Sequence, residues 1–299
     1  MQIKNGLQRL YRRCRGRWEA ELALRRYKDF RPERYDFTGE DVALYVSERA
    51  ALLPPVNVVG ADDNHFLLGV GDIEFYWPKN IPTGDLPWLY HEVFDDWREN
   101  PSSYDHPQFD LTAACWVMDA GAFEGFYSLF ALRKNFAGML IAVEPFPAME
   151  EALGLTLGKA ARESKYKVVA KALGSRMGHC YINQDAVSNC SSYVAEASPK
   201  DAWQKVELTT IDNLVREYGV EGPGIVKIDI EGYEMEALRG ARNTIESLKP
   251  KLAVAIYHDY MNARECARII RSFRSDYHIE FRGMYAYFEP PRPYLLFAY

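Results

Sequence analysis

Asp119 follows a short apolar run, residues 115–118, and precedes two closely spaced glycines, Gly121 and Gly125. The apolar run is typical of a buried strand, and the glycines predict a tight turn from that strand into a helix. A dinucleotide fingerprint needs glycines at its first, third and sixth positions, but Asp119 and Glu124 occupy two of these. A carboxylate at the strand end instead favours a ligand with an ammonium or sulfonium group, such as S-adenosylmethionine. The alternative is a plain strand-to-helix turn.

Glu144 ends a second apolar run, 25 residues after Asp119. An acidic side chain at this place can accept hydrogen bonds from both ribose hydroxyls of an adenosine. The alternative is a surface glutamate that opens a helix, where the helix dipole favours it. Lys171 and Ala172 end a third strand, at the edge that covers the adenine in a nucleoside site. We therefore expect these strand ends to bind an adenosine-containing ligand.

Three ionisable side chains, Lys227, Asp229 and Glu231, share one face of another apolar run. A strand inside a parallel sheet is normally apolar on both faces, and ligands bind beyond the carboxyl ends of such strands. These residues therefore predict a catalytic site, with a structural Lys–Asp pair as the alternative. His258 ends the next run, and a histidine at a strand end can accept a proton at neutral pH.

The elements that must position these residues begin near residue 113, where strand and helix patterns alternate. This alternation requires crossover connections and therefore a parallel sheet. The C-terminal end should form a hairpin, which makes one strand of the sheet antiparallel. Strands are predicted at 115–119, 139–144, 166–171, 224–230 and 251–257, helices near 125–135, 147–161, 233–247 and 262–275, the hairpin at 277–282 and 294–299, and a short strand pair at 179–183 and 205–209.

Residues 36–112 are predicted to form a small α+β extension ahead of a main domain at 113–299. The β-rich runs 65–70 and 72–77 are separated by Gly71 and predict a hairpin. Aromatic residues crowd the stretch that follows. They either wall a pocket for an acceptor or fill a small core, and a core is the default for such side chains.

Residues 1–35 are predicted to form a basic amphipathic helix. Residues 1–34 carry a net charge of +7, against −13 for the rest of the chain. An arginine-rich helix with a tryptophan can lie on an anionic membrane surface. The alternative, which we favour, is a helix packed on the body with a solvated basic face, because Gly6 and Gly16 weaken the helix. Its apolar residues recur at helical spacing: Ile3, Leu7, Leu10, Tyr11, Cys14, Trp18 and Leu22.

Composition narrows the function class. A net charge of −6 argues against a nucleic-acid groove as the main function. The five cysteines are odd in number and show no CxxC spacing, which predicts a reducing compartment and no zinc site. The chain has neither a membrane-spanning apolar run nor an apolar signal core, so we expect a cytoplasmic protein, with peripheral membrane contact as the alternative.

Together these segments resemble the FkbM family of S-adenosylmethionine-dependent methyltransferases over about residues 113–299. The resemblance implies a class I methyltransferase fold: a Rossmann-like, seven-stranded, mostly parallel sheet with an antiparallel C-terminal hairpin. It lies in an ordered set of motifs: Asp119-Ala-Gly121-Ala-x-x-Gly125, Glu144-Pro145, Ala172-Leu173-Gly174, the run 209–214, Lys227-Ile-Asp229-Ile-Glu231-Gly232-Tyr233-Glu234, the run 238–241, and Tyr257-His258.

The resemblance also implies roles for individual residues. Asp119 and Gly121 would contact the methionine part of the cofactor, and Glu144 would hold its ribose. Asp229 and Glu231 would lie at the sulfonium and acceptor side. The expected cofactor-binding set is completed by Phe123, Gly125, Pro145, Lys171 and Ala172.

The expected reaction is an in-line methyl transfer to a hydroxyl of a sugar, a glycan or a secondary metabolite. A base should remove the hydroxyl proton, and His258 or Asp229 could do so, with Glu231 and Lys227 orienting the groups. A divalent cation held by Asp229 and Glu231 would also lower the pKa of the acceptor, and the sequence does not separate these options. The rival functions are a nicotinamide-dependent oxidoreductase and a non-catalytic protein of the membrane surface.

Overall fold

The structure is a computed structural model that describes residues 2–28, 34–161, 164–183, 194–195 and 203–299. Within these residues a seven-stranded sheet has the order β13-β14-β12-β11-β4-β5-β6. All neighbours from β6 to β12 are parallel, whereas β14 runs antiparallel to both β12 and β13. This confirms the predicted fold class. The strands are β4 (Trp116–Ala120), β5 (Met139–Val143), β6 (Lys165–Val169), β11 (Gly224–Ile228), β12 (Lys251–Ala255), β13 (Ile279–Tyr285) and β14 (Arg292–Ala298).

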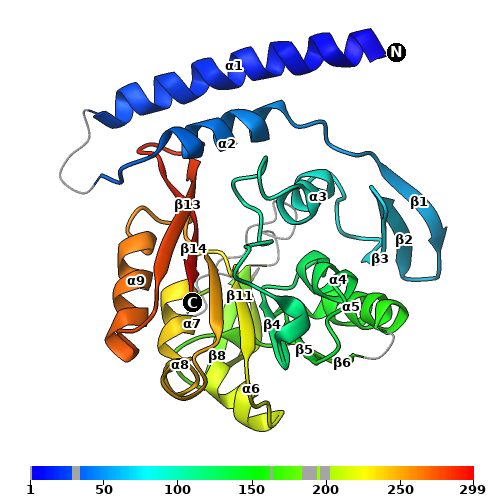
Figure 1. Cartoon of the computed structure of the whole chain (residues 1–299). Helices are drawn as coiled ribbons and strands as arrows, with labels where there is room; N and C mark the ends of the chain where they lie inside the picture. Colours follow the sequence, from blue (N-terminus) through cyan, green and yellow to red (C-terminus); the bar gives the residue numbers. More distant parts are fainter. Residues whose placement is uncertain (1, 29–33, 162–163, 184–193, 196–202) are drawn as a thin grey trace.

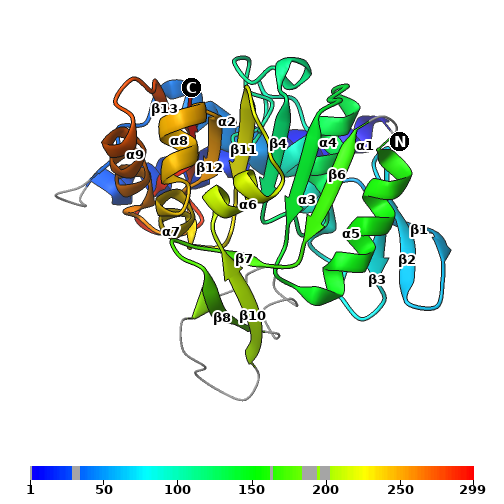
Figure 2. The ribbon, with the colours of Figure 1, turned by 90° about the horizontal axis from the view of Figure 1, so that it is seen from below.

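Helices cover both faces of this sheet (Figures 1 and 2). Successive residues of β4 point to opposite faces, so Val117 joins the apolar cluster beneath α4 and α5, whereas Trp116 and Met118 join the cluster beneath the later helices. Both faces are therefore buried, which explains the continuous apolar runs in the sequence. The helices are α4 (Phe126–Arg133), α5 (Pro147–Ala160), α6 (Ile211–Glu217), α7 (Glu234–Arg239), α8 (Arg242–Leu248) and α9 (Asn262–Phe273).

The segment 233–247 differs from the prediction, because it forms two helices instead of one. The break lies at Gly240, whose carbonyl accepts from the backbone N–H of Asp212 at 2.9 Å. A Cβ at Gly240 would stand 2.0 Å from the carbonyl oxygen of Gly174, so only glycine fits this approach. Helix α6 was not predicted either; the Thr210 side chain caps it by accepting from the N–H of Asn213 at 3.0 Å.

A second sheet, with the order β7-β10-β8-β9 among the described residues, projects from the body (Figure 2). Strands β8 and β10 pair antiparallel, as predicted for 179–183 and 205–209. Strand β7 joins this sheet directly after the third predicted strand of the main sheet. The bounds are β7 (Ala172–Leu173), β8 (Gly178–Asn183), β9 (Val194–Ala195) and β10 (Trp203–Thr209).

The N-terminal part contains the predicted hairpin, β2 (His65–Val70) and β3 (Ile73–Pro78), to which β1 (Val56–Ala61) adds a further antiparallel strand. Helix α3 (Leu86–Phe94) packs on α4, where Phe94 contacts Phe126 and Phe130. Most of the aromatic cluster is thus core, as expected. The division of the chain at residues 35 and 112 stays a prediction. A short 3-10 helix, Leu111–Ala113, leads into β4.

Helix α1 (Gln2–Lys28) lies along α2 (Gly39–Ala50), and α2 in turn lies on β13 (Figure 1). Small residues make the contact with α2: Gly16 and Ala20 are buried, and a Cβ at Gly16 would stand 2.7 Å from Cβ of Arg49. The expected apolar stripe faces outward instead, because the small residues allow the closer approach. Within the stripe, Leu10, Tyr11, Cys14 and Trp18 are exposed, whereas the side chains of Ile3 and Leu7 lie outside the described part.

Two further sequence predictions concern the whole chain. Among the described cysteines, Cys14, Cys115, Cys180 and Cys266 are free thiols, and Cys190 lies outside the described residues. Among the described residues, no helix is both long enough and apolar enough to cross a membrane.

Candidate functional site

A cavity lies at the carboxyl ends of the parallel strands. Its atom-free space measures about 1020 Å³, a figure that includes the open mouth. Its walls come from the loops after β4, β5, β11 and β12, from β7, and from α3 with Tyr104. The predicted site residues that line it are Gly121, Phe123, Glu144, Pro145, Lys171, Ala172, Lys227, Asp229 and Glu231.

The loop after β4 forms the floor of the cavity. Gly121 has φ +80°, and a Cβ there would stand 1.8 Å from the carbonyl oxygen of Asp229, so glycine lets the ends of β4 and β11 lie together. Gly125 caps α4 at φ +83° and packs against Leu153, but it does not line the cavity. Both glycines therefore shape the loop, but only Gly121 lies at the cavity surface.

Glu144 faces the cavity from the end of β5. Its Oε2 accepts from the N–H of Phe123 at 3.0 Å, and its Oε1 accepts from the N–H of Phe146 at 3.0 Å. Burial raises the pKa of Glu144 to about 7, although these two backbone hydrogen bonds lower it. Each carboxylate oxygen keeps a second lone pair, so Glu144 can also accept from the hydroxyls of a ribose.

Asp119 lies one layer behind the cavity wall and is fully buried. Its Oδ2 accepts from the N–H and the hydroxyl of Ser128, at 3.0 and 2.7 Å, and its Oδ1 lies 3.3 Å from Nζ of Lys227. Lys227 also donates to the carbonyl of Gly121 at 2.7 Å. Asp119 therefore acts on the cavity through Lys227 and the loop. The pair joins β4 to β11, whereas the sequence had suggested a Lys–Asp pair within one strand.

Burial lowers the pKa of Lys227, but the carboxylates of Asp119 and Asp229 outweigh burial and raise the pKa overall. Lys227 is thus a fixed ammonium group at the cavity wall. Its contacts hold the glycine loop against the end of β11.

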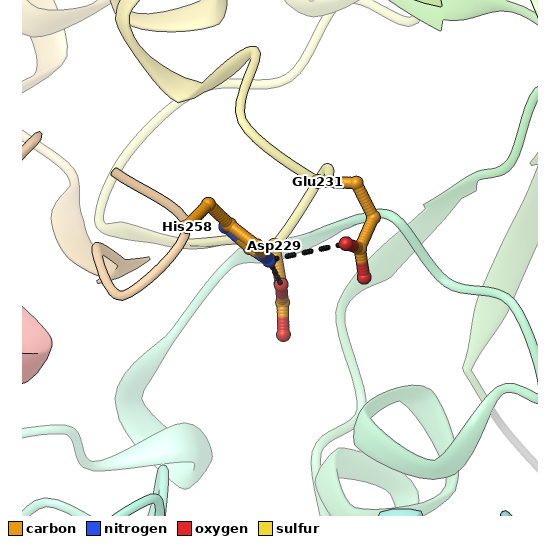
Figure 3. A group of neighbouring side chains, drawn as sticks. All are labelled: Asp229, Glu231 and His258. Carbon is orange, nitrogen blue, oxygen red and sulfur yellow. Dashed lines mark ion pairs between the residues drawn. The ribbon is translucent and has the colours of Figure 1, made fainter. Parts of the chain in front are cut away.

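Three predicted residues, Asp229, Glu231 and His258, form a cluster beside the cavity at the ends of β11 and β12 (Figure 3). Nε2 of His258 lies 3.3 Å from Oε2 of Glu231 and 3.7 Å from Oδ1 of Asp229. The other oxygen of Asp229 accepts from the hydroxyl of Tyr104 at 3.0 Å. His258 does not itself line the cavity, so the two carboxylates stand between its ring and the open space.

Burial would lower the pKa of His258, but the carboxylates of Glu234 and Glu231 raise it well above the ordinary value. A raised pKa favours the imidazolium form while nothing is bound at Nε2. A protonated imidazole cannot accept a proton, which weakens the prediction that His258 is the general base.

Sequence reasoning missed several residues that line the cavity. Glu92 and Val93 come from α3, and Tyr104, Tyr127 and Tyr257 add phenol rings to the wall. The aromatic cluster was recognised as a possible acceptor wall, but nothing in the spacing singled out Tyr104. Burial raises the pKa of Glu92 and of Glu124 to about 8. The cavity is thus rich in carboxyl groups that burial shifts toward the neutral form.

Comparison with known proteins agrees with this architecture. The sequence profile of the methyltransferase FkbM domain matches residues 119–283, which is more than half of the chain. The chain is also similar to Methyltransferase sdnD of Sordaria araneosa, with 27% identity over an alignment of 185 residues and a coverage of 52% of this chain and 69% of that protein.

A solved structure shares the fold. Methyltransferase FkbM from Methylobacillus flagellatus KT matches with a TM-score of 0.50 and 23% identity, over 70% of this chain and 48% of its own. The chain thus spans about half the length of that relative. From the extent of the domain match, the chain belongs to the FkbM family of S-adenosylmethionine-dependent methyltransferases.

Proposed function

We propose that this protein transfers a methyl group from S-adenosylmethionine to a hydroxyl of a sugar, a glycan or a secondary metabolite. The observation that carries the proposal is that Glu144, at the end of β5, and Asp229, at the end of β11, line the same cavity. One cavity thus joins a carboxylate suited to ribose with a carboxylate suited to an acceptor. Membership of a methyltransferase family argues against the alternative function, a nicotinamide-dependent oxidoreductase.

The residues present fit such a donor. S-adenosylmethionine supplies an electrophilic methyl group on a positively charged sulfur. Glu144 keeps acceptor capacity for ribose hydroxyls, and the remaining carboxyl groups of the wall favour a cation over an anion. Lys171, Ala172 and Pro145 lie at the edge where the sequence predicts the adenine. The protein's contribution to methyl transfer is chiefly to position donor and acceptor, which can supply about 7–11 kcal/mol.

Asp229 is the better candidate for the general base. Its side chain lines the cavity, whereas His258 lies behind the wall. The hydroxyl of Tyr104 donates to one oxygen of Asp229 and leaves the other for an acceptor hydroxyl. Glu231 lies beside it and can orient the acceptor, and Lys227 holds the floor loop.

Substitution of the base tests the mechanism. We expect Asp229→Asn to lower turnover by about 10²–10⁴-fold, because the acceptor keeps its proton, while donor affinity changes far less. Turnover is measured as S-adenosylhomocysteine formed with a panel of sugars, glycans and hydroxylated metabolites. Asp96→Asn, on an exposed loop outside the cavity, is the control.

Equilibrium binding of radiolabelled S-adenosylmethionine, with NAD as the comparison ligand, tests the donor separately. Binding of neither ligand, or of NAD alone, would overturn the proposed function. Unchanged turnover in Asp229→Asn would leave the donor assignment intact and remove Asp229 as the base.

A second candidate function is contact with an anionic membrane through α1. It is favoured by the outward stripe, in which Leu10, Tyr11 and Trp18 are 60%, 68% and 64% exposed. The arginines Arg12, Arg13, Arg15 and Arg17 on the same helix are exposed as well. Exposed apolar side chains flanked by arginines are the features of a helix that lies in a lipid interface.

A further inference from the structure

The cluster at the ends of β11 and β12 offers ligand atoms for a metal ion. One carboxylate oxygen each of Asp229 and Glu231 and one ring nitrogen of His258 lie within 4.8 Å of one another. Divalent ions bind such oxygen and nitrogen atoms at about 2.0–2.2 Å, which places neighbouring ligand atoms roughly 3–4 Å apart. The separations of 3.3 and 3.7 Å from Nε2 to the two carboxylates fall in this range.

The histidine supplies an independent observation. Its side chain is only 10% exposed, and within the described residues Nε2 makes no hydrogen bond of acceptable geometry. Nε2 is directed at Asp229 and Glu231 (Figure 3). A buried imidazole nitrogen without a hydrogen-bond partner needs a further ligand, and a metal ion between the three side chains would provide one.

The opposite side of the ring has the arrangement that metal-binding histidines require. Nδ1 lies 3.0 Å from Oε1 of Glu234, which is fully buried. The carboxylate of Glu234 is itself held by the N–H groups of Ile230 and Gly232, at 3.3 and 3.0 Å, and by Nδ2 of Asn262 at 3.1 Å. Histidines that bind metals commonly present their other ring nitrogen to a carboxylate in this way, which fixes the ring and its tautomer.

We propose that Asp229, Glu231 and Nε2 of His258 bind a divalent cation, with Glu234 as the residue that positions the histidine. Asp229 and Glu231 line the cavity, so the remaining coordination positions open toward the acceptor. A cation there lowers the pKa of a hydroxyl that binds to it, so that the hydroxyl loses its proton more readily, and Asp229 then serves as a ligand in place of its role as general base. This catalytic role rests on the proposed methyl transfer, but the binding of the cation does not.

The competing arrangement has a proton in place of the cation. His258 would then remain a charged imidazolium that pairs with the surrounding carboxylates, and the cluster would be purely structural. The two arrangements predict different behaviour toward added metal, because only the first contains a vacant ligand set after chelation.

The test is a titration of the chelator-treated full chain with Mn²⁺ at neutral pH, followed by the loss of the free-ion signal in electron paramagnetic resonance. We expect about one bound Mn²⁺ per chain, displaced by Mg²⁺ or Zn²⁺, and a higher melting temperature in its presence. Glu231→Gln and His258→Ala should each weaken binding at least tenfold, and Glu234→Gln about 10–100-fold. Asp96→Asn, on an exposed loop outside both the cavity and the cluster, should bind as the wild type does.

Absence of Mn²⁺ binding by the wild-type chain would overturn the metal site even if a variant failed to fold. Binding that persists at full strength in His258→Ala would do the same. Donor binding and S-adenosylhomocysteine formation are measured on the same preparations. Metal binding without donor binding would defeat the proposed function alone, and methyl transfer without metal binding would defeat the metal site alone.

Discussion

At the scale of single residues, burial converts ordinary carboxyl groups into groups that titrate near neutral pH. Glu144 is 4% exposed, and burial raises its pKa to about 7. The neutral form of this side chain has one weaker acceptor oxygen and one hydroxyl, whereas the ionised form can accept from both hydroxyls of a ribose. Donor binding should therefore favour the ionised form.

This gives a prediction about pH. The donor affinity of the wild type should rise about tenfold from about pH 6 to about pH 8, since Glu144 ionises over that interval. Glu144→Gln should bind more weakly, by about 1.5–3 kcal/mol at the upper end, and should lose most of the pH dependence. Calorimetry with S-adenosylhomocysteine at several pH values measures both. Asp96→Asn, outside the cavity, should keep the wild-type slope, and a flat profile in the wild type would contradict this assignment.

At the scale of elements, the apolar runs predicted the centre of the sheet well because β4, β5, β11 and β12 are buried on both faces. The strand ends were equally readable, since Glu144 and Asp229 follow those runs directly. The split of 233–247 was not, because it depends on a close approach between Gly240 and Gly174 from another part of the chain. Tyr104 was missed for the same reason: its partner, Asp229, lies 125 residues away.

Helix α1 shows how a correct helical pattern can be assigned to the wrong side. The apolar spacing was recognised, but the side that packs is formed by Gly16, Ala20 and Ala23. A prediction from helical periodicity relies on large apolar side chains and gives no weight to glycine and alanine. Small residues, however, allow two helices to approach most closely. The exposed stripe is therefore a feature that only the tertiary structure reveals.

The stripe leads to a prediction about membranes. The wild type should co-sediment with vesicles that contain phosphatidylserine, less so at high salt, because both apolar insertion and charge contribute. Trp18→Ser should reduce this binding severalfold while leaving the fold intact. Val58→Ser is the matched control, because Val58 on β1 has the same 64% exposure as Trp18. Equal binding to neutral vesicles, or no loss in Trp18→Ser, would rule out this contact.

At the scale of the whole molecule, stability should depend on carboxyl groups that folding buries. Glu48, on α2, is 2% exposed, and Oε2 has no hydrogen-bond partner among the described residues. Burial raises its pKa from 4.5 to about 7, although His91 and Arg49 oppose the shift. The unfolded chain ionises first, so raising the pH between these values favours unfolding, and the loss of stability is complete above about pH 7.

Replacing this carboxyl removes the effect. The free energy of unfolding of Glu48→Gln relative to the wild type should increase by about 2–3 kcal/mol from about pH 5 to about pH 8. Urea denaturation at the two pH values measures the change. Glu40→Gln, exposed on the same helix, should show no such trend. If the difference in unfolding free energy between Glu48→Gln and the wild type were the same at both pH values, Glu48 would have its ordinary pKa in the folded protein.

Part of the cavity wall comes from residues that precede the matched domain. The family match begins at residue 119, yet Glu92, Val93 and Tyr104 precede it and close one side of the site. A chimera that exchanges only residues 119–283 would receive the matched domain but not the cavity wall formed by Glu92, Val93 and Tyr104. Substitutions in the chain ahead of residue 119 can thus reshape this side of the cavity while leaving the matched domain unchanged.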